Sequence, residues 1–181
     1  MVADHEWLSP TRLVGLSAYT ICFLACAARW ASCRNNRVQS VPLAALAAVQ
    51  FTLLLDMALD WRWKIHDFWM REAMALGVYD RRRAPQLLAL AMRSLVVALA
   101  SVSIVYRFRR RLGFAVALTG TMLSVALWCC EWVSLHLIDQ LFYRKVGGVM
   151  VVGLLWALLA LLTSVGVWLD SRGSLSANLT C

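Results

Sequence analysis

The chain alternates long apolar stretches with short polar segments that are mostly basic. A helix needs about 20 residues to cross the roughly 30 Å hydrocarbon core of a bilayer. Five stretches are long enough, at approximately residues 13–31, 41–61, 85–106, 113–132 and 147–169. Apolar residues run continuously through them, and lipid requires each spanning segment to satisfy its own backbone hydrogen bonds. The pattern predicts an all-α fold, a polytopic transmembrane helix bundle of about five spans.

The second span does not end cleanly. After residue 61, apolar residues recur at helical spacing, for example at Ile65, Phe68 and Trp69, among charged neighbours, and no helix breaker occurs before Gly77. Such a mixture is typical of an amphipathic helix at a membrane surface. We therefore expect a long amphipathic extension after the second span, which lies at the membrane surface or rises from it.

Composition supports one membrane unit. The chain is 61% hydrophobic and 15% charged, whereas the apolar share of a soluble domain is near half. No linker rich in proline, glycine or serine divides it, so residues 1–181 are predicted to form a single membrane domain. Small residues at Ala44 and Ala48, and at Ala117 and Gly120, would let helices approach closely.

The formal charge of +8 does not indicate nucleic acid, because the basic residues cluster in short segments between the spans. Membrane topology requires such clusters, and the expected partner is the lipid bilayer. The densest clusters, at 34–37 and 107–111, lie tight against span ends. The positive-inside rule then places the N-terminus outside and the C-terminus in the cytoplasm. Preference for arginine over lysine suggests a bacterial inner (plasma) membrane.

Acidic and histidine residues gather toward the other face. Five spans thread almost all of them to that side, with Asp170 as the exception; the set is Asp4, Glu6, Asp56, Asp60, Asp67, Glu72, Asp80, Glu131 and Asp139, with His5, His66 and His136. A metal, proton or cationic-ligand site would need such groups at one face. The alternative is that they are solvated charges of the loops and the extension.

Two charged residues lie inside predicted spans. Asp56 is about two turns from the end of the second span, and Arg93 lies at a similar depth in the third. A charge near a helix centre costs at least about 2.5–3.5 kcal/mol, so each should face the protein interior and have a partner. We predict an Asp56–Arg93 ion pair, with Glu131 as the substitute partner. The pair would fix helix register or serve as a gate or proton step.

A polar cluster is expected where the second and fourth spans leave the membrane, formed by Asp60, His66, Glu131, His136 and Asp139. Within it, His66, His136, Asp60 and Glu131 could hold a divalent metal ion. Against this, no Glu-x-x-His, His-x-x-x-His or HExxH pattern occurs, and an interfacial histidine is often a snorkelling polar tip. We therefore expect no cofactor, with a divalent metal as the alternative.

No catalytic motif occurs, and the six cysteines form no Cys-x-x-Cys pair. The leading hypothesis is therefore a non-catalytic accessory or scaffold subunit that contacts other membrane subunits or another copy of itself. One alternative is a proton- or ion-conducting transporter component that uses Asp56, Arg93 and Glu131. Another is a metal-dependent membrane enzyme that uses His66 and His136, so enzymatic activity stays open.

Overall fold

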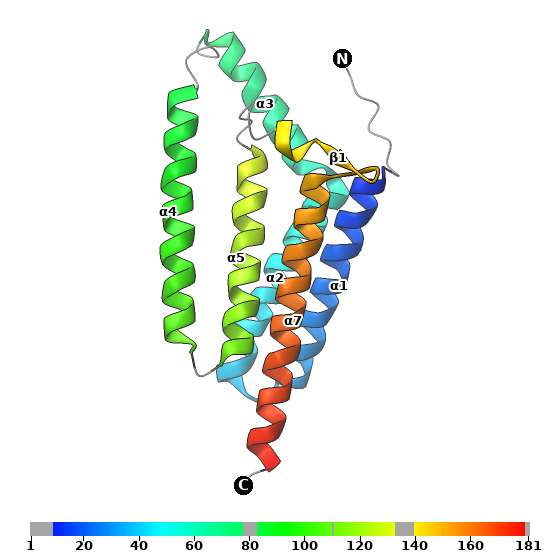
Figure 1. Ribbon diagram of the computed structural model, residues 1–181, viewed down its shortest axis with the longest axis vertical. Helices are drawn as coiled ribbons and strands as arrows, with labels where there is room; N and C mark the ends of the chain where they lie inside the picture. The colour runs from blue at the N-terminus through cyan, green and yellow to red at the C-terminus, as the bar shows by residue number, and fades with distance from the viewer. Residues whose placement is uncertain (1–8, 78–82, 110, 133–139, 180–181) are drawn as a thin grey trace.

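The computed structural model describes residues 9–77, 83–109, 111–132 and 140–179, with backbone only at 63, 66, 73, 83–85 and 174–179. Its long helices are α1 (Pro10–Ser32), α2 (Arg37–Leu59), α3 (Trp61–Ala75), α4 (Arg83–Arg107), α5 (Leu112–Trp132) and α7 (Val151–Leu179). A short helical stretch at 140–142 precedes the antiparallel hairpin of β1 (Lys145–Val146) and β2 (Val149–Met150). The predicted all-α bundle is confirmed (Figure 1).

Five helices in this part of the chain are long and apolar enough to cross a membrane: Pro10–Ser32, Arg37–Leu59, Gln86–Arg107, Leu112–Glu131 and Val151–Gly173. The chain is therefore a membrane protein with the predicted number of spans. One boundary was wrong, because the fifth helix begins at Val151 rather than near residue 147. Gly147 and Gly148, with φ of +59° and +84°, form the tight turn of the hairpin before it, as two-residue hairpin turns require.

The local chemistry of the chain sets the helix ends. Ser9 caps α1 by accepting a hydrogen bond from the backbone N–H of Arg12, and Pro10 occupies the first turn, where its missing N–H costs nothing. Asn36 caps α2 in the same way. The extension after α2 is a separate helix, because Asp60 between them has a left-handed backbone (φ 56°, ψ 33°). Asp60 therefore changes the direction of the chain at the end of the second span.

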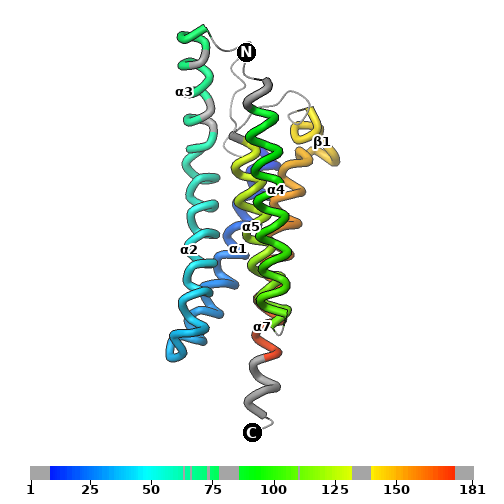
Figure 2. Tube along the Cα trace, turned by 90° about the vertical axis from the view of Figure 1, so that its left-hand side faces the viewer, coloured from blue at the N-terminus to red at the C-terminus, as the bar shows by residue number. Residues whose placement is uncertain are grey.

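Four of the spanning helices make the core, and α4, the third span, stands beside them. α7 packs between α1 and α5, and α2 packs on α1, whereas α4 packs mainly on α5 (Figures 1 and 2). No residue of the α4 span is buried. Only a stripe at helical spacing is half-buried; it includes Leu90, Arg93, Val97 and Ile104. Most of the α4 surface therefore faces lipid or a partner.

Glycines bring α5 and α7 into close contact. A Cβ on Gly166 would lie 2.3 Å from the backbone nitrogen of Ala117, and one on Gly113 would lie 2.2 Å from that of Asp170. At Gly120 a Cβ would lie 2.6 Å from the Thr163 hydroxyl. Small residues allow this approach, and packing of this kind stabilises helix pairs in lipid. α5 and α7 thus form a rigid support for the polar groups at both ends of the bundle.

Candidate functional site

A buried ionic network joins four helices at the end of the bundle where α3 begins. Asp56 of α2 is fully buried, and Arg62 of α3 donates from Nε to its Oδ2 at 2.7 Å. The same guanidinium donates from Nη1 to Oε2 of Glu131, near the end of α5. Trp156 of α7 donates from Nε1 to Glu131 Oε1 at 2.7 Å, and its ring lies 5.0 Å from the guanidinium carbon. We call these four residues the Arg62 network.

The electrostatics of this network hold Arg62 in its charged form. Its side chain is 4% exposed, against 0% for Asp56 and 6% for Glu131. Burial disfavours the guanidinium charge, but the carboxylates of Glu131 and Asp56 outweigh burial and raise the pKa of Arg62 above its usual value. Because the charge is permanent, the two carboxylates have a fixed counter-ion inside the protein. The network therefore joins helices through a cation that stays charged.

Arg12 of α1 braces the break between α2 and α3. Its Nη1 lies 2.8 Å from Oδ2 of Asp60, and its Nη2 donates to the Ala58 carbonyl at 2.9 Å. A cation at the C-terminal end of a helix also interacts favourably with the helix dipole. This contact stabilises the left-handed Asp60 that orients Arg62.

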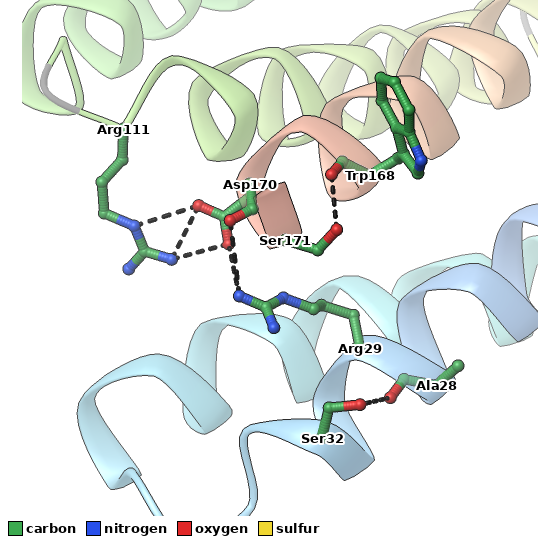
Figure 3. A network of polar contacts seen from close by, with 7 residues as sticks. All are labelled: Ala28, Arg29, Ser32, Arg111, Trp168, Asp170 and Ser171. Carbon is green, nitrogen blue, oxygen red and sulfur yellow. Dashed lines mark hydrogen bonds and ion pairs between the residues drawn. The ribbon is translucent and has the colours of Figure 1, made fainter. Parts of the chain in front are cut away.

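A second ionic cluster lies at the opposite end of the bundle (Figure 3). Arg111, just before α5, donates from Nη2 to both carboxylate oxygens of Asp170 at 2.9 Å, and from Nε to Oδ1 at 3.2 Å. Arg29 of α1 lies 3.6 Å from Oδ2 of the same carboxylate. Sequence reasoning did not single out this cluster. The available signal was that Asp170 is the sole acid on a strongly basic face.

The predicted Asp56–Arg93 ion pair is wrong, because Asp56 is paired with Arg62. Arg93 instead donates from Nη1 to the backbone carbonyl of Cys129 at 2.6 Å. Glu131, the substitute partner proposed for Arg93, also pairs with Arg62. The physical reason is the placement of α4, which packs on α5 rather than on α2. Arg62 lies in the segment that the sequence predicts as an amphipathic extension outside the spans, so the pattern does not indicate it as the partner of Asp56.

The predicted polar cluster is only partly visible. Asp60 and Glu131 have separate partners, Arg12 for the first and Arg62 with Trp156 for the second. His136 and Asp139 lie outside the described residues, as does the side chain of His66. Within the described part of the chain, no group of three or more His, Cys, Asp or Glu residues is placed to hold a metal ion. The metal hypothesis, which needs His66 and His136, stays a prediction.

Comparison of the chain with protein-family models, with curated proteins and with solved structures gives no match.

Proposed function

We propose that this protein is a non-catalytic accessory or scaffold subunit of a membrane complex, and that α3 is the helix on which a partner subunit docks. The observation that carries the proposal is a set of exposed large apolar residues on α3, outside the five spans. Their exposed fractions run from 44% to 72%; the residues are Trp61, Phe68, Trp69 and Met74, with Leu76 at the C-cap of the helix. Aromatic residues and methionine are enriched where proteins bind one another.

The length of α3 argues against a simple aromatic belt at the lipid headgroups. Trp69 follows the last residue of α2, Leu59, by ten positions, which is about 15 Å along a helix. The headgroup layer on one side of a bilayer is only about 5–7 Å thick. Both views show α3 continuing past the end of α5 rather than folding flat against it (Figures 1 and 2). An exposed tryptophan on a helix that leaves the end of the bundle in this way is better covered by protein than by lipid.

The pairing of the intramembrane carboxylates with Arg62 also favours a structural role. Asp56 and Glu131 are the acids that a proton- or ion-conducting component would use, and both are held by Arg62. Breaking a buried pair by removing one partner costs about 3–5 kcal/mol, so a carrier cycle that opened the network would be slow. Conduction is the alternative function. It predicts liposome proton flux that is lost in Asp56→Asn and Glu131→Gln.

The docking helix can be tested in membranes of the native host. We expect the tagged wild-type chain, extracted in mild detergent, to migrate on native gels as an assembly well above its own 20.3 kDa. Phe68→Ser with Trp69→Ser should shift it toward the free chain. Lys64→Ser with Arg71→Ser, which changes exposed charges on the same helix, is the matched control and should not. Two differently tagged copies would distinguish a second copy from another subunit.

A wild-type chain that is monomeric in detergent and in nanodiscs, with no crosslinked partner in intact membranes, would overturn the proposal. Enzymatic use of a divalent metal by His66 and His136 is tested separately, by metal analysis of the purified protein.

We further propose that the protein resides in a bacterial inner membrane with its N-terminus outside and its C-terminus in the cytoplasm. Supporting this orientation, the end of the bundle that carries Arg29, Arg34, Arg37, Arg107, Arg109 and Arg111 is strongly basic and has short connections between its helices. Cytoplasmic loops carry this excess of basic residues.

A further inference from the structure

An apolar groove opens sideways between α2 and α4, with α5 as its floor. Its volume is about 460 Å³. Pro42 and Ala45 of α2 form one wall, and Val97 of α4 forms the other. Along the floor the lining runs from Phe114 to Cys129. Since fifteen residues of helix are about 22 Å long, the groove is longer than half of the roughly 30 Å hydrocarbon core.

One positive charge lies at the end of this groove. The guanidinium of Arg93 contacts the carbonyl of Cys129, which is three residues before the end of α5 and thus about 5 Å from it. None of the ion pairs among the described residues includes Arg93. Within the part of the chain that the structure describes, a neutral carbonyl satisfies one donor of Arg93 and no carboxylate compensates its charge. An anion at this level, near the boundary between hydrocarbon and headgroups, would complement it.

The shape of the groove favours a thin occupant. A transmembrane helix about 10 Å wide could place only one of its faces in a space of about 460 Å³. An acyl chain is thin and flexible, and from a headgroup near Arg93 it would run along the α5 floor toward the bilayer midplane. The guanidinium fork is also suited to bidentate contact with phosphate oxygens.

We propose that the groove between α2 and α4 is a binding site for an anionic phospholipid, whose phosphate pairs with Arg93 and whose acyl chain lies along α5. This site is independent of the docking role of α3. Basic pockets between membrane helices recognise anionic headgroups by this chemistry.

The test uses the full chain in nanodiscs of phosphatidylcholine alone or with phosphatidylglycerol. We expect phosphatidylglycerol to raise the thermal midpoint of the wild type and to copurify with it in native mass spectra. Arg93→Gln should weaken that binding roughly tenfold or more, as expected for the loss of a charge-assisted hydrogen-bonded pair. Arg71→Gln, on exposed α3, is the control and should bind as the wild type does.

A second variant keeps the charge of Arg93 but obstructs the space for the acyl chain. Ala45 is an exposed wall residue, so Ala45→Phe should fold, retain Arg93 and still lose phosphatidylglycerol. Inorganic phosphate should not reproduce the thermal shift. The proposal would be overturned if the wild type retained both lipids equally, or if Arg93→Gln and Ala45→Phe bound phosphatidylglycerol as the wild type does. A thermal shift with phosphate alone, or a protein found bound in the groove in place of the lipid, would also overturn it.

Discussion

Arg62 connects α2, α3, α5 and α7 through one guanidinium, and its position depends on the backbone at Asp60. In a continuous helix Arg62 would lie six residues after Asp56, about 240° around the axis and so away from it. The left-handed Asp60 breaks that geometry and lets the pair form at 2.7 Å. Sequence reasoning required a partner for an intramembrane aspartate. It could not identify this one, because the turn that brings Arg62 back has no proline or glycine.

Removing the shared cation should therefore destabilise the protein strongly. We expect Arg62→Gln to lower the free energy of unfolding by about 3–5 kcal/mol, because two buried carboxylates lose their counter-ion. Unfolding in mixed micelles, followed by tryptophan fluorescence, measures the effect. Arg71→Gln, an exposed arginine of the same helix, should change stability by no more than about 0.5 kcal/mol.

The triple variant Asp56→Asn, Arg62→Gln and Glu131→Gln separates the charge from the shape of the network. It should be more stable than Arg62→Gln alone, since no uncompensated charge remains buried. Equal stability of Arg62→Gln and Arg71→Gln would show that the Arg62 network does not hold the bundle together.

At the scale of elements, hydropathy predicted the five spans because crossing a bilayer imposes both length and composition. It failed at the start of α7, where the apolar run continues through Val146, Val149 and Met150 of the hairpin. The consecutive glycines Gly147 and Gly148 were the signal for a turn. Packing was predicted only in part. Ala117 and Gly120 do lie against α7, but Gly113 and Gly166 approach as closely and were not singled out.

The close contact between α5 and α7 predicts that a larger residue at Gly166 lowers stability. Alanine is normally about 0.5–1 kcal/mol more favourable than glycine inside a helix. At Gly166, however, the new Cβ would lie 2.3 Å from the Ala117 nitrogen, and overpacking typically costs about 1–3 kcal/mol. Gly166→Ala should therefore lower the thermal midpoint in detergent.

Gly173 offers the matched control, because it lies on the same helix and a Cβ there meets nothing within 4 Å. Gly173→Ala should leave the midpoint unchanged or raise it slightly. A Gly166→Ala protein as stable as Gly173→Ala would mean that α5 and α7 are not packed this closely.

For the whole molecule, the two ends of the bundle differ in charge although both contain buried ion pairs. At one end, Arg12 and Arg62 are matched by Asp60, Asp56 and Glu131. At the other, Asp170 is the acid shared by Arg29 and Arg111. The sequence predicted this asymmetry, because successive spans place alternate loops on opposite faces of the membrane. Which acid meets which base depends on helix rotation and on neighbours far along the chain, and no spacing rule gives that.

The asymmetry predicts the orientation of the protein. Basic loops resist translocation, so the end that carries Arg34, Arg37, Arg107 and Arg109 should stay in the cytoplasm. A fluorescent protein fused to the C-terminus should then be bright, and alkaline phosphatase fused after Gly77 should be active. Changing the exposed residues Arg34, Arg37, Arg107 and Arg109 to alanine should produce a mixed population, because Arg29 and Arg111, which bind Asp170, are kept. The reverse reporter pattern in the wild type would mean that the acidic end, with α3, faces the cytoplasm, and a partner for α3 would then be sought there.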